Sequence, residues 1–159
     1  MSVKKKSFAI APVGQVKRAK YGVQLRIDAQ YRPALKHLGR FSHVIVLWWA
    51  EKFDDAQYRS ILQTRPFYAE KVLTGIFATR SPIRPNPVAS TVCKILDVDE
   101  EEGVVVVSDI DAYDGTPIID LKGYFPIADK VCDPRIPDWL PAKWYECVPD
   151  EGEGPDQSS

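Results

Sequence analysis

The chain has 159 residues, of which 45 % are hydrophobic and 11 % aromatic, and its formal net charge is −1. This composition is typical of a globular protein with one core and excludes a disordered or fibrous chain. The longest apolar run, residues 44–50, is far shorter than the roughly 20 residues of a membrane-spanning helix, so we expect no membrane protein.

The N-terminal residues indicate where in the cell the protein is located, and the cysteines indicate whether it binds a metal. Residues 4–6 are lysines, and the short apolar stretch after them is broken by Pro12 and lacks a clear cleavage site. We therefore expect no signal peptide and a cytoplasmic protein. The three cysteines form no Cys-x-x-Cys pair, and the chain has only two histidines. This spacing predicts no zinc or haem site and leaves open only a metal site built from carboxylates.

Short segments of alternating or continuous apolar residues predict strands along most of the chain. We expect strands over 7–16, 21–27, 42–50, 71–79, 88–98, 103–113 and 116–125. The last two flank Asp114-Gly115, a dipeptide typical of two-residue hairpins. Helices are expected only over 32–38, where Pro33 suits a first turn, and over 54–62.

Many strands and little helix favour a mainly β fold with a single closed or nearly closed β-barrel and one or two short helices. Closure would leave few strand edges exposed. We expect the barrel domain to span residues 1–148. Residues 149–159 are acidic and polar, and we expect them to form a disordered tail.

Charge is segregated along the sequence. Residues 1–40 hold ten lysines or arginines and one acid, a local net charge of +9, whereas residues 97–120 hold nine acids and no base. Such segregation indicates one basic face for a polyanion. The alternative is a surface on which the two segments lie together and their charges mix.

The segment 77–90, "FATRSPIRPNPVAS", combines two arginines with three prolines and has no acid. Proline fixes its own φ and pushes the preceding residue toward extended conformations. The two guanidinium groups, on Arg80 and Arg84, would then be held in place before a ligand arrives. The alternative is a stiff connection whose arginines only face solvent.

Two segments carry a family resemblance, "TGIFATRSPIRPNP" (74–87) and "DIDAYDGTPIIDLKGYFP" (109–126). Together with "PVGQVKR" (12–18) and "LGRFSHVIVL" (38–47), they resemble the TsaA-like family over roughly residues 8–145. The resemblance implies a single TsaA-like β-barrel that binds S-adenosyl-L-methionine and forms a homodimer. It also implies methylation of N6 of threonylcarbamoyladenosine at position 37 of tRNA.

The resemblance also implies site residues, carried over by motif position. Those expected to bind the cofactor are Ala50, Glu51, Arg80, Ser90, Ile110, Asp111, Ala112 and Tyr113. Those expected to face the substrate are Arg84, Asn86 and Lys122. Asp111 and Asp114 are candidate proton acceptors. Asp114 could instead serve only the hairpin turn, and Lys122 could be the partner of Asp120 in a strand ion pair.

The sequence departs from the family where many relatives carry a long Pro-Arg-Gln loop after the first strand. Here only a short connection follows Gln15, and we expect no counterpart of the extra C-terminal RNA-binding domain of some relatives. The fold inference does not depend on these parts, but the substrate inference does. Two alternatives therefore stay open: the same cofactor with another RNA or a small molecule as acceptor, and a non-catalytic RNA- or protein-binding module.

Overall fold

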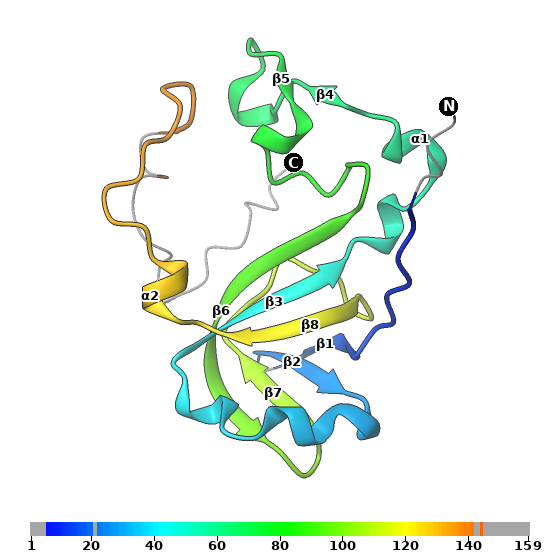
Figure 1. Cartoon of the computed structure of the whole chain (residues 1–159), viewed down its shortest axis with the longest axis vertical. Coiled ribbons are helices and arrows are strands. Elements are labelled where there is room, and N and C mark those ends of the chain that lie inside the picture. The colour runs from blue at the N-terminus through cyan, green and yellow to red at the C-terminus, as the bar shows by residue number, and fades with distance from the viewer. Residues whose placement is uncertain (1–5, 21, 142–143, 145–159) are drawn as a thin grey trace.

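The computed structural model describes residues 6–20, 22–141 and 144, and its main body is a closed antiparallel barrel (Figure 1). In barrel order its six strands are β1 (Gly14–Ala19), β2 (Gly22–Ile27), β7 (Val104–Val107), β6 (Val88–Asp99), β3 (His43–Trp49) and β8 (Pro117–Gly123). Pairing of Gly14 with Ile118 joins the first strand to the last and closes the ring. The expected mainly β barrel is confirmed.

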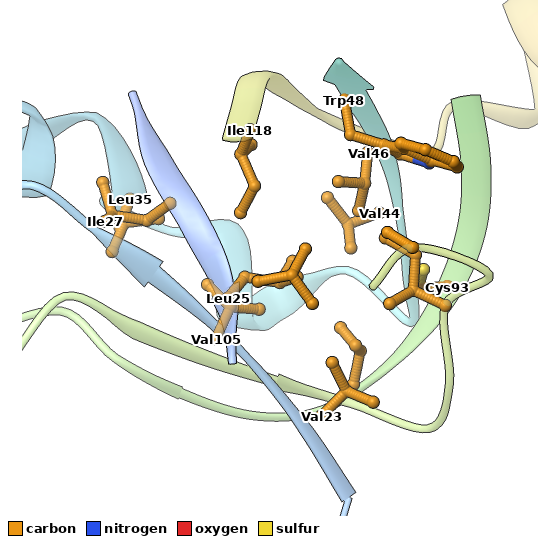
Figure 2. Packing of buried hydrophobic residues seen from close by; sticks show 14 of the residues in the cluster. Val23, Leu25, Ile27, Leu35, Val44, Val46, Trp48, Cys93, Val105 and Ile118 are labelled. Atoms are coloured by element: carbon orange, nitrogen blue, oxygen red, sulfur yellow. The ribbon is translucent and has the colours of Figure 1, made fainter. Parts of the chain in front are cut away.

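The barrel forms because its strands alternate with a period of two. In β3, Val44, Val46 and Trp48 point inward, and the residues between them are half-buried. Inward residues of β2 and β7, such as Leu25 and Val105, meet them to fill the interior with side chains (Figure 2). The barrel therefore has a packed core rather than a pore, as expected for so few strands.

Strand β6 is the longest, and it takes part in both halves of the barrel. Its first half, through Lys94, pairs with β3, and its second half, from Ile95, pairs with β7 after an irregularity between Ile95 and Asp97. This long strand connects the end of the barrel that bears the 79–87 loop to the opposite end (Figure 1).

The remaining elements are short and lie outside the barrel. A two-stranded sheet, β4 with β5, stands at one end of the barrel, and the 3-10 turns of residues 29–35 and 38–40 lie across the other (Figure 1). Besides β4 (Gln63–Thr64) and β5 (Thr74–Gly75), they are α1 (Ala56–Arg59), α2 (Pro126–Asp129), η1 (Ala29–Leu35), η2 (Leu38–Arg40), η3 (Glu51–Phe53), η4 (Phe67–Ala69) and η5 (Ile76–Ala78).

Three expected strands are much shorter than predicted, and one of them, expected over 103–113, forms only over Val104–Val107. The segment 7–16 becomes a strand only at Gly14, because Pro12 has no N–H to donate and residues 7–12 are exposed. The segment 71–79 holds only the two residues of β5, followed by the turn η5. Its apolar residues do not form one face: Ile76 is buried, whereas Phe77 is 80 % exposed.

The expected hairpin around Asp114-Gly115 is wrong. The turn exists, with Gly115 at a φ of 81° and a hydrogen bond of 3.2 Å from the Thr116 N–H to the Tyr113 carbonyl. However, β7 ends at Val107, and it pairs with β2 and β6 rather than with β8. Residues 108–113 form a loop, and the turn contacts β1, where the Gly115 N–H donates to the Val16 carbonyl at 2.7 Å.

The expected helices are shorter or of another type. The segment 32–38 is covered by two 3-10 turns, interrupted at His37, which has a φ of 70°. Within 54–62 only α1 forms, and its first turn is capped by the Asp55 carboxylate, which accepts a hydrogen bond of 2.8 Å from the Tyr58 N–H. The predicted acidic tail over 149–159 lies outside the described residues.

Candidate functional site

A cavity of about 580 Å³ opens at the end of the barrel where β3 finishes and β6 begins. Antiparallel pairing of Trp49 with Val88 places these two strand ends side by side. The loop 79–87 and the loop after β7 complete the wall. The lining residues are Trp48, Ala50, Glu51, Lys52, Phe53, Phe77, Thr79, Arg80, Pro82, Arg84, Asn86, Val88, Ala89, Ser90, Asp111, Tyr113 and Thr116.

The proline-rich loop is held by its own polar groups. The Thr79 hydroxyl donates to the Ile76 carbonyl at 2.8 Å, and the Ser81 hydroxyl accepts from the Ile83 N–H at 3.2 Å. Arg84 reaches back across the loop, and its Nη1 donates to the carbonyls of Thr79 (3.4 Å) and Ser81 (3.3 Å). These last two hydrogen bonds are long and therefore weak. Arg84 is half-buried in the cavity wall. Because its hydrogen bonds are weak, its guanidinium is only lightly restrained.

Arg80 ties the loop to β6. Its Nη2 donates to both the carbonyl and the hydroxyl of Ser90, the latter at 3.2 Å. Ser90 itself pairs with Leu47 of β3. Arg80 is therefore fixed against the barrel at the start of β6, and the two predicted site residues lie in direct contact.

An outer brace of Arg59, Asp54 and Trp49, none of which lines the cavity, supports the same loop. Arg59 of α1 donates from Nη1 to the Pro85 carbonyl at 3.2 Å, and from Nε to the Asp54 carboxylate at 2.5 Å. The other oxygen of Asp54 accepts from the Trp49 indole at 2.9 Å. The hydrogen bonds from Arg59 and Trp49 hold the pKa of Asp54 below its usual value. The loop is thus fixed by α1 as well as by its prolines.

The opposite wall is the loop that contains Asp111 and Tyr113. Arg18 of β1 secures it: Nε donates to the Ala112 carbonyl at 3.1 Å, and Nη2 donates to the carbonyls of Ile110 and Ala112. Its Nη1 also lies 3.6 Å from the Asp109 carboxylate. The N-terminal strand therefore fixes the backbone from which Asp111 and Tyr113 extend.

Two further contacts shape the lining. The Asp111 carboxylate accepts a hydrogen bond from the Thr91 hydroxyl, which in turn accepts one of 3.1 Å from the Trp48 indole. Within the lining, the Lys52 ammonium lies 3.8 Å from the centre of the Tyr113 ring, a cation–π contact. The cavity wall thus presents cations, carboxylates and an aromatic face within one volume.

Most of the predicted site residues come together here. Eight of them line the cavity: Ala50, Glu51, Arg80, Arg84, Asn86, Ser90, Asp111 and Tyr113. Four do not. Ile110 and Ala112 are each 1 % exposed and belong to the core, so they support the wall from behind. Asp114 and Lys122 lie away from the lining.

Asp114 and Lys122 have other partners in the structure. The Asp114 carboxylate accepts from the Arg18 N–H at 2.7 Å and lies 3.2 Å from the Lys17 ammonium, and these contacts lower its pKa. The Lys122 ammonium lies 2.8 Å from Asp120, which raises the pKa of Lys122. The strand ion pair that the sequence left open is therefore present.

Sequence reasoning missed several lining residues. Trp48 was predicted only as part of a buried strand, and Lys52 and Phe53 follow the motif residues Ala50 and Glu51 without forming a pattern of their own. Phe77 and Thr79 are inside the quoted signature, beside Arg80. Their position next to Arg80 was the one signal that could have identified them.

The charge prediction has a mixed outcome. Two cations of the basic N-terminal segment meet the acidic segment through the contacts of Lys17 with Asp114 and of Arg18 with Asp109. Arg32 also reaches the acidic segment, where it donates to the main-chain carbonyl of Glu101 at 2.8 Å. The two segments therefore mix in part, and a basic face for a polyanion stays a prediction for the other cations.

Among residues 6–20, 22–141 and 144, no group of three or more histidines, cysteines or acids is placed to hold a metal ion. No helix within those residues is long and apolar enough to cross a membrane.

Comparison with known proteins assigns the barrel to a family. Residues 3–130 match the family described as the tRNA-methyltransferase O N-terminal domain. The chain is 36 % identical over 141 residues to a probable S-adenosyl-L-methionine-binding protein of Archaeoglobus fulgidus. The aligned residues cover 89 % of this chain and 35 % of that protein. A protein of the same description from Pyrococcus horikoshii is 37 % identical over 121 residues, covering 76 % of this chain and 85 % of it.

A mouse tRNA (adenine(37)-N6)-methyltransferase is 41 % identical over 96 residues, which cover 60 % of this chain and 21 % of the mouse protein. Two crystal structures of TrmO share the fold. One has a TM-score of 0.63 at 28 % identity and covers 82 % of this chain. The other, from Pseudomonas aeruginosa, has a TM-score of 0.61 at 26 % identity and covers 82 % of this chain. This chain spans 64 % and 62 % of those two chains, and 35 % of the Archaeoglobus protein.

Proposed function

Because the chain belongs to the TsaA-like family of the tRNA-methyltransferase O N-terminal domain, we propose that it is an S-adenosyl-L-methionine-dependent methyltransferase of tRNA. The observation that carries the proposal is the cavity, where eight residues assigned by motif position line one volume of about 580 Å³. A volume of this size is typical of sites for small molecules and cofactors.

The lining fits the chemistry of this cofactor. S-adenosyl-L-methionine carries a carboxylate, two cationic centres and an adenine ring. Arg80 offers a guanidinium for the carboxylate, and Glu51 and Asp111 offer carboxylates for the cationic centres. Tyr113, which is 52 % exposed, offers a ring face on which a base can stack. We expect a dissociation constant in the micromolar range, which corresponds to a binding free energy of about −8 kcal/mol.

When bound, S-adenosyl-L-methionine would supply the methyl group from its sulfonium centre to the acceptor nitrogen, and S-adenosyl-L-homocysteine would be left as the second product. Positioning of the acceptor by the cavity can lower the activation free energy by roughly 7–11 kcal/mol. The acceptor nitrogen must also lose a proton. We assign that proton to the carboxylate of Asp111, because Asp111 lines the cavity whereas Asp114 holds the turn against β1.

We propose that the acceptor is N6 of threonylcarbamoyladenosine at position 37 of tRNA. The similarity to the mouse tRNA (adenine(37)-N6)-methyltransferase supports N6 of adenine 37 as the acceptor. The threonylcarbamoyl group carries a carboxylate, and Arg84 and Asn86 are the lining residues proposed to bind it. A tRNA substrate implies a cytoplasmic location, and the family resemblance implies a homodimer, which light scattering of the purified protein tests.

The test combines cofactor binding with methyl transfer. Purified protein is titrated with S-adenosyl-L-methionine in a calorimeter and then incubated with tRNA that carries threonylcarbamoyladenosine and with the same tRNA lacking it. Mass spectrometry of the nucleosides measures methylation. We expect a methyl group only on the modified tRNA.

Each other outcome selects an alternative. Methylation of the unmodified tRNA would correct the substrate but not the activity. Binding of the cofactor without transfer to either tRNA would favour another acceptor or a non-catalytic binding module. The absence of a binding signal at millimolar cofactor would contradict the proposal as a whole.

A further inference from the structure

Three side chains from three different elements form a chain of hydrogen bonds that ends in the cavity. Trp48 belongs to β3, Thr91 to β6, and Asp111 to the loop after β7. The Trp48 indole Nε1 donates to the Thr91 hydroxyl at 3.1 Å, and that hydroxyl donates to Oδ1 of Asp111. From this arrangement we propose that Thr91, oriented by Trp48, is a positioning residue that holds the Asp111 carboxylate for methyl transfer.

The direction of the two hydrogen bonds is fixed by chemistry. An indole N–H can only donate, so the Thr91 oxygen must be the acceptor in the first bond. The hydroxyl has a single proton, and the first bond leaves that proton free to point at Asp111. An ionised carboxylate only accepts. The chain of donors therefore runs from the core toward Asp111, and it restrains one of the two carboxylate oxygens.

Thr91 lies on the face of β6 that turns toward the core, where packing alone does not require a hydroxyl. Ala89, Thr91 and Cys93 alternate along β6 and share one face, on which Cys93 is 1 % exposed and Ala89 packs against the core. Valine would suit that face, since it has the same shape and no polar atom. Thr91 is half-buried, and both hydrogen bonds found for its hydroxyl belong to this chain.

Other groups near Asp111 do not replace this contact. Burial, together with the carboxylates of Asp111 and Asp109, raises the pKa of the Cys93 thiol to about 12, so Cys93 stays protonated and does not compete for the proton. The remaining charged residues that line the cavity are Glu51, Lys52, Arg80 and Arg84. Within the described residues no hydrogen bond from any of these four to Asp111 is found.

The first arm of the test needs no ligand. Protein labelled with 15N at tryptophan gives one indole N–H resonance per tryptophan, and Trp48→Phe identifies that of Trp48. We expect Thr91→Val to shift the Trp48 resonance because it removes the acceptor of the indole N–H, and Asp111→Ala to shift it because the Thr91 hydroxyl reorients when it loses its own acceptor. Thr74→Val, in β5 and outside the cavity lining, is the matched control and should leave it in place. A Trp48 resonance unmoved by Asp111→Ala would overturn the chain of hydrogen bonds.

The second arm rests on the proposed function and measures single-turnover methyl transfer beside cofactor affinity. We expect Thr91→Val to lower the transfer rate at saturating substrates by at least about tenfold, because misplacement of a reacting group is costly. Thr91→Ser keeps the hydroxyl and should stay within about threefold of the parent. In an Asp111→Asn background, Thr91→Val should add little, since the two residues act as one unit.

The outcomes separate the two proposals. If the parental protein neither binds the cofactor nor transfers methyl, the proposed function fails, and the first arm still decides whether the chain of hydrogen bonds exists. If the parent is active and Thr91→Val transfers methyl at the parental rate, the positioning role fails. Thermal unfolding of each variant identifies any loss of rate that is due to loss of fold.

Discussion

Replacing Arg84 tests whether the proline-rich loop serves the reaction or only connects two strands. The guanidinium makes two hydrogen bonds within the loop, at 3.4 and 3.3 Å, to the carbonyls of Thr79 and Ser81. Bonds of good geometry contribute about 0.5–1.5 kcal/mol each, and these are long. Arg84→Ala should therefore cost about 1 kcal/mol of unfolding free energy, or a fall in Tm of roughly 2–4 °C for a chain of this size.

The cost to catalysis should be larger than the cost to stability. If Arg84 binds the acceptor, Arg84→Ala should slow single-turnover methyl transfer at least about tenfold, which corresponds to about 1.4 kcal/mol, while cofactor affinity stays close to that of the parent. Arg84→Lys should restore little, because an ammonium cannot reproduce the planar, two-pronged contact of a guanidinium with a carboxylate.

The outer brace provides a matched control. Arg59 contacts the same loop through the Pro85 carbonyl but does not line the cavity. Its pair with Asp54 is about one-third exposed, so Arg59→Ala should lower stability by about 1 kcal/mol. Its effect on transfer should be weaker than that of Arg84→Ala. Transfer by Arg84→Ala at the parental rate would refute the reasoning and leave the loop as a connection.

Three other predictions follow from the site and the charge pattern. Arg80→Ala should weaken cofactor binding at least about tenfold in calorimetry, and an unchanged affinity would remove Arg80 from the cofactor site. Folding lowers the pKa of Asp54 below its usual value of 3.8, so the stability that its carboxylate contributes is present above that pH and is lost as the pH falls. The difference in unfolding free energy between the parent and Asp54→Asn should therefore shrink from pH 7 to pH 3. A difference that stays constant in denaturant titrations would contradict this. Affinity for tRNA should fall steeply with salt and be lowered by Arg26→Glu or Arg40→Glu, with little change in cofactor binding; an affinity independent of salt would count against a basic face.

The period-two pattern was enough to predict the barrel but not its connections. Strands β2, β3, β6 and β8 were expected close to where they lie, because one face of each has to fill the interior. The hairpin at Asp114-Gly115 was wrong since a turn dipeptide specifies a local bend and not the partner of the strand that follows it. Strand pairing is decided by closure of the whole ring.

The residues of the site could be predicted from local motifs, but their contacts with distant parts of the chain could not. The motifs located Arg80, Arg84 and Asp111, which the structure brings to one cavity. They could not show that Ile110 supports the wall from the core, because the two faces of a loop are indistinguishable before its contacts are known. The role of Trp48 in the cavity wall could not be predicted either, since its partner Thr91 lies on another strand. The functional roles of all these residues stay predictions.

The attachment of β1 to the cavity wall has a consequence for the order in which the protein folds. Arg18 and Asp114, which join that strand to the wall, are 96 positions apart in the chain. Contacts between such distant residues form late, because a long loop must close before they are made. Since the same strand fixes the backbone of Asp111 and Tyr113, the capacity to bind a ligand should appear only when the ring closes. In a refolding experiment, the recovery of ligand binding would therefore time the closure of the barrel, and it should lag behind the recovery of strand content measured by circular dichroism.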